Sequence, residues 1–292
     1  MNREKRLTIF TPTYNRVYIL PQLYYSLVNQ TSKDFVWLIV DDGSTDNTES
    51  VVNEWMKEEK IQIIYTKQLN QGKSSAHNSG VELTHTELFT CVDSDDFLVK
   101  DAVERVINLW KENKEKCIVG ILTFKQYADG RTLTSMGSSC IKCTLKEAYS
   151  RYHLSGDAML IYRSDIIKQF NFPEFDGEKF VPEAYLYDLI DQKGKLLIIK
   201  AALYCCEYLE DGYTQNMAKL LVNNPKGYLA YVEQRLELDK DIKDKVLDTI
   251  RYTAMCLASN EKRYITKSVY PIITIFTLPI AYIFYIKRYK NL

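Results

Sequence analysis

Three carboxylates, those of Asp93, Asp95 and Asp96, follow an apolar run that ends at Val92. Acids packed this closely repel one another, so they need a cation or a ring of hydrogen-bond donors to stay ionised. A divalent metal that carries a diphosphate is the leading candidate, because Mg²⁺ and Mn²⁺ prefer hard oxygen ligands. The alternative is a solvated acidic turn that opens the next helix, where Asp is favoured.

A second acidic segment, DDGSTDNT, spans residues 41–48 and also follows an apolar run. Gly43 permits a tight turn there, and Asp46 or a neighbour caps the following helix. The carboxylate of Asp42 is our choice for a contact to a ribose or a base imide, as made by the acid after a strand in dinucleotide folds. The alternative is an ordinary turn with a helix cap.

A third segment, LNQGKSSAHNSG at residues 69–80, combines a glycine, a cation and the start of a helix. Gly72 gives the backbone freedom, Lys73 supplies positive charge, and the first amides of the helix favour an anion. The segment lacks the GxxxxGK[ST] spacing of a Walker A loop. Lys73 either faces a phosphate or is solvated, and His77 either contacts a phosphate or packs on a buried face.

The elements that position these segments alternate along the first 124 residues. Runs of β type are expected at 7–10, 36–40, 61–65, 88–92 and 118–124, and helices at 19–29, 48–57, 75–83 and 102–112. Strands separated by single helices predict parallel pairing with right-handed crossovers, hence an α/β fold. Residues 126–142 are predicted to form a hairpin or loop, and helices are predicted from Gln215 to about Ser259.

The three segments and TPTYNR at residues 11–16 resemble, in this order, family 2 glycosyltransferases with the GT-A fold. Members carry TPxYN, DDGSxDxT, NxGxxxARNxG and DxDD, and the similarity is strong over about residues 7–110. One departure is His77, which stands where members usually have Arg, beside Asn78; it affects the expected diphosphate contact more than the class. The resemblance implies an inverting transfer from a nucleotide sugar, with Mn²⁺ or Mg²⁺ as cofactor.

The resemblance also implies roles for individual residues. Asp95 would be the direct metal ligand, and Asp93 would meet the ribose or a metal-bound water. The set expected to bind the nucleotide sugar is Thr11, Pro12, Tyr14, Asp42, Gly72, Lys73, Asn78, Asp93 and Ser94. A metal that bridges the diphosphate oxygens would stabilise the charge that develops on the leaving group.

Inverting transfer needs a base for the acceptor hydroxyl, placed across the sugar from the diphosphate. Residues 175–190 offer Glu178, Glu183 and Asp188, and we favour Glu183 because it follows Pro182 at the expected start of a helix and sits where related enzymes carry an acidic base. Helix capping is its alternative role. Further acceptor-side candidates are Asp157, Glu178, Glu207 and Asp211. Four tyrosines, Tyr185, Tyr187, Tyr204 and Tyr208, either stack on sugar rings or belong to the core.

Bulk composition narrows the class of protein. The 292 residues contain 38 basic and 38 acidic side chains, which disfavours a nucleic-acid partner. Seven cysteines without a recognisable secretory leader are typical of reduced thiols in a cytoplasmic chain. We therefore expect the catalytic part to work in the cytoplasm.

The C-terminal segment at residues 268–286 has 19 uncharged residues and is flanked by basic side chains on both sides. Its length approaches that of a membrane span, but two basic flanks and two prolines favour an interfacial or re-entrant anchor. The alternative is a helix packed in the core or in a homodimer interface. Anchoring would bring the protein to a membrane-bound acceptor at the inner face of the cell membrane.

These expectations combine into one organisation. Residues 1–213 form the catalytic domain, with a nucleotide-sugar half (1–124) and an acceptor half (125–213); residues 214–264 form a helical extension and 265–292 a membrane-associating tail. The expected substrates are a nucleotide sugar, with UDP as the favoured nucleotide, and a glycan or lipid-linked acceptor. The alternatives are a polyprenyl-phosphate sugar synthase, a nucleotidyltransferase and a non-catalytic nucleotide-sugar-binding scaffold subunit.

Overall fold

The computed structural model describes residues 5–206, 217–238, 241–290 and 292. The chain divides into two compact units. The first contains Met1–Asn171 and Leu186–Leu209, and the second contains Phe172–Tyr185 and Glu210–Leu292. Each unit is described by itself.

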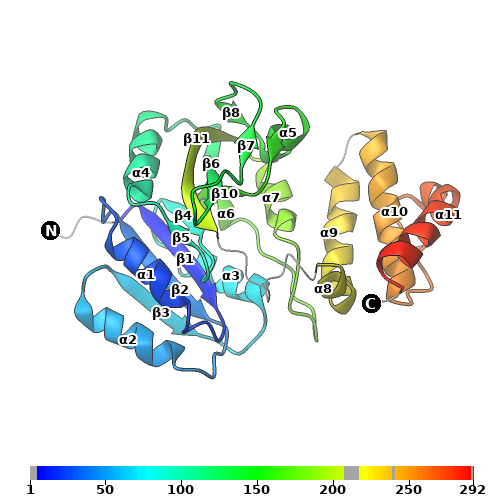
Figure 1. The fold of residues 1–292 in the computed structure, drawn as a ribbon. Coiled ribbons are helices and arrows are strands. Elements are labelled where there is room, and N and C mark those ends of the chain that lie inside the picture. Colours follow the sequence, from blue (N-terminus) through cyan, green and yellow to red (C-terminus); the bar gives the residue numbers. More distant parts are fainter. Residues whose placement is uncertain (1–4, 207–216, 239–240, 291) are drawn as a thin grey trace. The chain divides into compact units, whose positions relative to one another are not determined.

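The first unit is built on a mixed sheet with the strand order β3-β2-β1-β4-β10-β6-β11-β5 (Figure 1). Its parallel half consists of β1 (Leu7–Thr13), β2 (Phe35–Asp41), β3 (Ile63–Lys67) and β4 (Leu88–Cys91). The helices between these strands are α1 (Leu20–Val28), α2 (Thr48–Glu58) and α3 (Lys73–Glu82), and α4 (Ala102–Glu112) follows. The predicted α/β fold, a mostly parallel sheet flanked by helices, is confirmed.

Strands β1, β2 and β4 are buried on both faces and are rich in apolar residues, whereas β3 at the edge of the sheet is partly exposed. In β2 the side chains of Phe35, Trp37 and Ile39 pack in one core cluster, whereas Leu38 and Val40 pack in another. Successive side chains of a strand point to opposite faces, so β2 joins two hydrophobic layers. Both layers are closed by helices, which leaves the strand ends as the place for polar loops.

The other half of the sheet departs from simple alternation. Strand β6 (Ile118–Tyr127) has the expected direction, but the antiparallel strand β10 (Ala158–Arg163) lies between it and β4. The long strand β11 (Lys195–Cys206) runs parallel to β6 and pairs antiparallel with β5 (Phe97–Leu98) and β8 (Lys142–Cys143). Segments distant in the sequence therefore complete the sheet beside the acidic motif.

Short elements decorate this half. Strands β7 (Ser135–Met136) and β9 (Leu154–Ser155) form a separate ribbon, and the expected hairpin turn occurs around Gly130. Helix α5 (Leu145–Ser150) has a capping box made by Thr144 and Glu147. Helices α6 (Ser164–Ile167) and α7 (Ala184–Ile190) follow.

The second unit combines the irregular segment 172–183 with helices, and the helices expected after Gln215 are present among its described residues. It contains α8 (Met217–Asn223), α9 (Pro225–Leu238), α10 (Ile242–Ala258) and α11 (Pro271–Arg288). Its core includes Tyr228, Val232, Tyr252, Met255 and Tyr289. Asp248 is buried on α10 and accepts hydrogen bonds from Arg235 at 2.7 Å and Arg251 at 2.5 Å.

Candidate active site at the carboxyl ends of the strands

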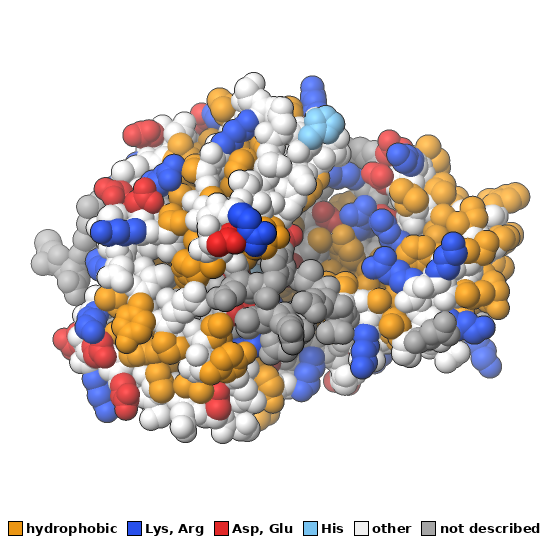
Figure 2. All heavy atoms as spheres, viewed as in Figure 1, with side chains coloured by type: hydrophobic (Ala, Val, Ile, Leu, Met, Phe, Trp, Pro, Cys, Tyr) orange, Lys and Arg blue, Asp and Glu red, His pale blue; other side chains and the backbone are white. Residues whose placement is uncertain are grey.

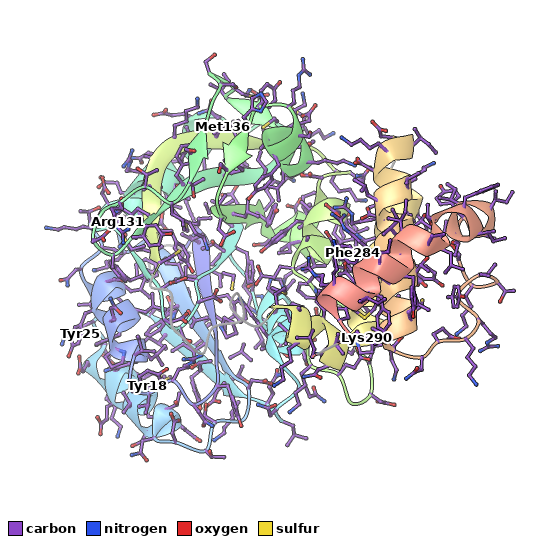
Figure 3. The ribbon with its side chains drawn as sticks, turned by 45° about the vertical axis from the view of Figure 1, so that its right-hand side comes forward. Tyr18, Tyr25, Arg131, Met136, Phe284 and Lys290 are labelled. Carbon is purple, nitrogen blue, oxygen red and sulfur yellow. The ribbon has the colours of Figure 1, made fainter. Side chains whose placement is uncertain are left out.

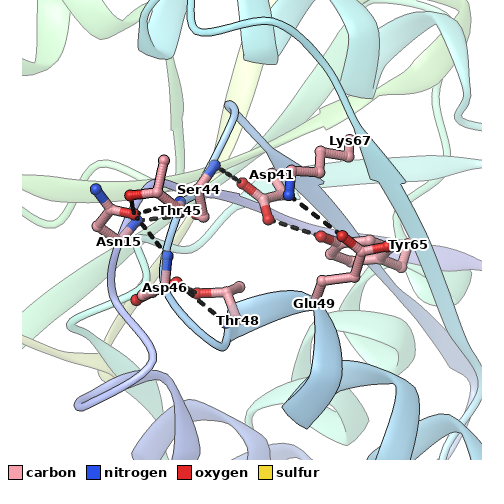
Figure 4. A network of polar contacts seen from close by, with 9 residues as sticks. All are labelled: Asn15, Asp41, Ser44, Thr45, Asp46, Thr48, Glu49, Tyr65 and Lys67. Atoms are coloured by element: carbon pink, nitrogen blue, oxygen red, sulfur yellow. Dashed lines mark hydrogen bonds and ion pairs between the residues drawn. The ribbon is translucent and has the colours of Figure 1, made fainter.

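The loops after β1 and β2 are tied together by Asn15 (Figure 4). Its side-chain oxygen accepts hydrogen bonds from the amides of Thr45 at 2.8 Å and Asp46 at 3.3 Å. Its own amide donates to the hydroxyl of Ser44 at 2.9 Å. Asn15 has φ 53°, a left-handed conformation that Asn tolerates better than most residues. The first two motifs thus form one rigid surface.

The two acids that end β2 have different structural partners. Asp41 accepts from the Ser44 amide at 2.7 Å and from the Tyr65 hydroxyl at 2.6 Å (Figure 4). Asp42 instead accepts from the amides of Gln71 at 2.9 Å and Gly72 at 2.7 Å. It also accepts from the Gln68 side chain at 2.8 Å. The carboxylate of Asp42 therefore holds the third loop against the second.

The third loop leads into the N-terminus of α3 and meets the acidic motif. Gly72, with φ 93°, precedes the helix, and Lys73 is its first residue. The Lys73 ammonium lies 2.7 Å from a carboxylate oxygen of Asp93, with both side chains partly exposed. A cation, a helix N-terminus and a carboxylate thus share one place, which suits a phosphate bound through a metal.

The acidic turn is held from behind by Tyr204 of β11. The Tyr204 hydroxyl accepts from the amide of Asp93 at 3.1 Å and donates to the carboxylate of Asp96 at 2.7 Å. The ammonium of Lys125 lies 4.1 Å from the centre of the Tyr204 ring, a cation–π contact. One buried phenol therefore fixes both ends of the turn that presents Asp95.

Burial and mutual repulsion disfavour ionisation of two of the three acids. Burial, and then the charge of Asp93, raise the pKa of Asp96 to about 7. The same two causes raise the pKa of Asp95, against a smaller opposing effect of Arg16 and Lys73. The cluster is therefore an environment that a bound cation would relieve.

The donor set fits a divalent ion that is shared with a substrate. Among the residues that the structure describes, no three His, Cys, Asp or Glu side chains converge into a metal-binding cluster. The protein would therefore supply few ligands, with Asp95 as the leading one, and substrate phosphates and water would complete the shell, as is common for Mg²⁺. Asp93 and Asp95 are hard oxygen donors of the required type.

The remaining donor-side candidates lie at different depths. Thr11 is fully buried and accepts from the Trp37 indole at 3.0 Å, whereas the side chain of Tyr14 is 47% exposed. Ser94 is buried in the acidic turn, and Pro12 is half-buried in β1. Asn78 is half-buried on α3. The base-pocket role of these residues stays a prediction.

His77 packs on a buried face, the second of its two expected roles. Its ring makes edge contacts with Phe10, at 5.6 Å between centroids, and with Phe89, at 5.4 Å. The side chain is 8% exposed. In this position the imidazole contributes to the core under α3.

The acceptor-side candidates separate by surroundings. Glu183 is exposed and directly precedes α7, the expected helix start, and belongs to the second unit. Glu178 accepts from the amides of Lys226 at 3.0 Å and Gly227 at 2.9 Å, so it caps α9. Asp157 is exposed before β10, and its carbonyl accepts from the Thr134 hydroxyl. Glu207 and Asp211 lie outside the described residues.

Three residues of the site carried little or no sequence signal. Arg16 ends the first motif and acts on Asp95 through its charge. Lys125 and Tyr204 come from strands 79 residues apart in the sequence, and no motif links them to Asp93. Tyr204 is 1% exposed, so its predicted role in stacking on a sugar ring is not available to it. Only the pairing of β11 with β5 and β6 brings them to the acidic turn.

The four motifs lie in the loops at the carboxyl ends of β1 to β4, at one edge of an α/β sheet. The sequence pattern of glycosyl transferase family 2 matches residues 8–170, so the chain belongs to that family and is a glycosyltransferase. Its resemblance to the family, expected from the motifs, is thereby confirmed.

The chain aligns with different shares of the length of its curated relatives. The chain is 25% identical over 247 residues to the GalNAc(5)-diNAcBac-PP-undecaprenol beta-1,3-glucosyltransferase of Campylobacter jejuni, covering 82% of this chain and 78% of the relative. It is 29% identical over 214 residues to the minor teichoic acid biosynthesis protein GgaB of Bacillus subtilis, covering 70% of this chain but only 23% of GgaB.

Solved structures show the same fold. Residues 1–349 of TarS from S. aureus, in complex with UDP-GlcNAc, superpose with a TM-score of 0.65 at 18% identity, covering 97% of this chain and 81% of TarS 1–349. The mannosyltransferase PcManGT from Pyrobaculum calidifontis, in complex with GDP-Man and Mn2+, gives a TM-score of 0.58 at 12% identity, covering 97% and 82%. Both likenesses confirm the GT-A type of fold.

Proposed function

We propose that the protein transfers a hexose, with inversion at the anomeric carbon, from a UDP-sugar to a hydroxyl of a lipid-linked or polysaccharide acceptor. The observation that carries this proposal is the meeting of Lys73, the α3 N-terminus and the Asp93–Asp96 turn at one edge of the sheet. That arrangement suits a nucleoside diphosphate more than any other common ligand, because it combines anion binding with hard oxygen donors.

In the donor half, the chain's own residues bind and orient the diphosphate. Asp42 fixes the third loop, so that the first amides of α3 and the Lys73 ammonium are preorganised for the phosphate oxygens. Arg16 adds positive charge beside Asp95. A divalent ion held by Asp95, with Asp93 beside it, would act as a Lewis acid on the leaving diphosphate.

In the acceptor half, Glu183 is the proposed base. Its carboxylate takes the proton of the acceptor hydroxyl while the hydroxyl oxygen bonds to the anomeric carbon and the bond from that carbon to the diphosphate oxygen breaks. The products are a glycoside of inverted configuration and a nucleoside diphosphate. Glu178 is the weaker candidate, because its carboxylate already caps α9.

The relatives support the choice of substrates and place. TarS binds UDP-GlcNAc, and the Campylobacter relative is a glucosyltransferase that acts on a glycan linked to PP-undecaprenol. A lipid-linked acceptor of this kind would place the reaction at a membrane, and we propose the cytoplasmic face of the cell membrane.

The first test is release of nucleotide from a panel of UDP-, GDP- and other nucleotide sugars, with and without Mn²⁺. We expect metal-dependent release from one donor class by the wild type, with a loss of about 10²-fold or more in Asp95→Ala, because the variant lacks the leading metal ligand. Asp129→Ala, which removes an exposed acid on the turn after β6, is the matched control and should keep full activity.

Two outcomes would count against the proposal. Equal turnover by wild type and Asp95→Ala would remove the metal role of the acidic turn. Tight binding of a nucleotide sugar without turnover, even with lipid-linked acceptors supplied, would favour a non-catalytic binding subunit.

A further inference from the structure

Helix α11 exposes its apolar side chains and buries its small polar ones. The large exposed side chains are Ile272, Ile275, Phe276, Ile280, Tyr282, Ile283 and Ile286, and Phe276 is 79% exposed. The buried residues of the helix are Thr274, Thr277 and Ala281. With 3.6 residues per turn, these two sets occupy opposite faces. A helix at a water-exposed surface normally buries its apolar face and exposes its polar one, and α11 does the opposite.

By length and composition α11 is the one described helix that could cross a membrane, and 17% of its most apolar 18 residues are buried. A core helix of a soluble protein would be mostly buried, so the interpretation of this segment as a packed core helix is not supported. What covers its apolar face must be something apolar outside the described chain.

Both ends of α11 are fastened to the second unit, which opposes a spanning arrangement. At the start, Tyr270 donates to the carbonyl of Leu236 at 3.2 Å and lies under the ammonium of Lys245 at 4.9 Å. Beyond the end, Tyr289 is 4% exposed and packs in the helical core. Its ring contacts the ring of Phe284, which is labelled on α11 in Figure 3. A spanning helix would have to leave α10 or carry its charged residues, such as Lys243 and Asp244, into hydrocarbon.

The charges near α11 favour a lipid surface over a second copy of the chain as the partner of its apolar face. Residues 261–292 contain one acidic side chain, Glu261, which pairs with Arg263 and Lys267, and six basic ones: Lys262, Arg263, Lys267, Lys287, Arg288 and Lys290. Hydrophobic side chains gather over α11 in Figure 2, with Lys and Arg near them. Two copies packed through this face would bring two such basic sets together, whereas anionic lipid headgroups complement them.

We propose that α11 lies in the plane of an anionic lipid surface, with its apolar face among the acyl chains and the basic side chains at its ends on the headgroups. The tyrosines of the segment would sit at headgroup level, where aromatic rings with a polar tip are favoured. Membrane binding by α11 would hold the enzyme beside a lipid-linked acceptor. Only this role of the binding rests on the proposed function.

The test uses the full-length protein and preformed vesicles of phosphatidylcholine, alone or mixed with phosphatidylglycerol, in a sedimentation assay. We expect binding to the anionic vesicles that falls with rising salt. Ile275→Ser with Phe276→Ser and Ile283→Ser should weaken it more than about tenfold, because the apolar contact is lost. Met56→Ser with Ile141→Ser, two exposed apolar residues of the first unit, is the matched control and should bind as wild type.

A second variant tests the proposal independently if the triple Ser variant misfolds. Lys262→Gln with Lys287→Gln and Lys290→Gln keeps the apolar face and should reduce both the affinity for anionic vesicles and its salt dependence. A C-terminal tag should be removed by a protease added outside the vesicles, because an in-plane helix does not carry its end across.

Three results would overturn the proposal. The first is equal vesicle binding by wild type and the triple Ser variant. The second is protection of the C-terminal tag from the protease. The third is a wild type that does not bind vesicles and forms dimers in light scattering, with a Ser variant that is monomeric. Nucleotide-sugar turnover with a water-soluble acceptor is measured on the same proteins. Absence of turnover in a wild type that still binds vesicles would count against the proposed function and would leave this inference unaffected.

Discussion

At the scale of single residues, the acidic turn is held by the hydrogen bond that the Tyr204 hydroxyl donates to the Asp96 carboxylate. The phenol is buried and the carboxylate is 7% exposed, so water contributes little to either. Such a pair is rigid, which fixes the backbone of Asp93 and, through it, the position of Asp95.

The raised pKa of Asp96 predicts a specific pH dependence of stability. The carboxyl group ionises near 3.8 in the unfolded chain and at about 7 in the folded protein, so the folded state binds the proton more tightly between these values. The free energy of unfolding therefore falls as pH rises from about 4 to about 7. Each unit of pKa shift is worth ~1.4 kcal/mol, so the whole shift is worth about 4 kcal/mol, and we expect Asp96→Asn to remove this fall.

The measurement is urea unfolding across this pH range with a chelator present. Asp129→Asn, an exposed acid, serves as control and should follow the wild-type curve. Parallel curves for wild type and Asp96→Asn would show that Asp96 has an ordinary pKa.

Tyr204→Phe should impair the site without unfolding the sheet. The ring and its contact with Lys125 remain, but Asp93 loses an acceptor for its amide and Asp96 loses a donor. We expect kcat to fall about tenfold and the affinity for Mn²⁺ to weaken, because the carboxylates are less well held. Both are read from a Mn²⁺ titration of turnover.

The control for this variant is Tyr24→Phe. Tyr24 is also buried, in the same core cluster as Tyr204, and donates to a carboxylate, that of Glu58, at 2.6 Å, but Glu58 ends α2 and is not part of the acidic turn. Equal kinetic effects of the two variants would mean that Tyr204 acts only through general stability.

At the scale of elements, Glu178 and the favoured base Glu183 lie at the starts of different helices. Glu178 caps α9 by accepting two amide hydrogen bonds, whereas Glu183 is exposed just before α7. The carboxylate of Glu178 therefore has a structural role as a helix cap, and Glu183 stays the proposed base because of its place directly before α7.

We therefore expect opposite phenotypes for the two acids. Glu178→Ala should lower the free energy of unfolding by about 1 kcal/mol, the usual cost of a lost cap, with transfer largely kept. Glu183→Gln should leave stability and UDP binding unchanged but reduce transfer by about 10²-fold or more. Calorimetry and a transfer assay on both variants decide the matter, and loss of transfer in Glu178→Ala alone would exchange their roles.

At the scale of the whole molecule, the two units have separate cores, and the boundary between them passes through α7. A change in the core of one unit should therefore alter its local stability more than that of the other. The buried group of Asp248, Arg235 and Arg251 in the second unit provides the place to test this.

Asp248→Ala should lower the stability of the second unit by about 3–5 kcal/mol, because it leaves Arg235 without its buried carboxylate. Amide hydrogen exchange should show faster exchange in α9 and α10, with α1 and α2 unchanged. Asp165→Ala removes the acid of an exposed pair with Arg163 and should cost under ~1 kcal/mol. Uniform loss of protection in both units would show that the molecule unfolds as one.

The sequence by itself determined the α/β half of the protein and the class of its site. Local patterns specify each buried strand and each loop at a strand end, so β1–β4, α1–α4 and the four motifs follow from short stretches of chain. Helices α8, α9 and α10 were likewise predictable, because helical periodicity is a local property. Helix α11 differs from the prediction, because it continues through Pro279, which was expected to break it.

Only the tertiary structure decided what depends on distant partners. The insertion of β10, the passage of Tyr204 behind Asp96, and the use of Asp42 to hold Gly72 all join residues with no fixed spacing. The same holds for α11: packing on α10 covers the face with Thr274, Thr277 and Ala281 and leaves the large apolar side chains exposed. Hydrophobic burial and hydrogen bonding choose such partners from the whole chain, and no local pattern encodes that choice.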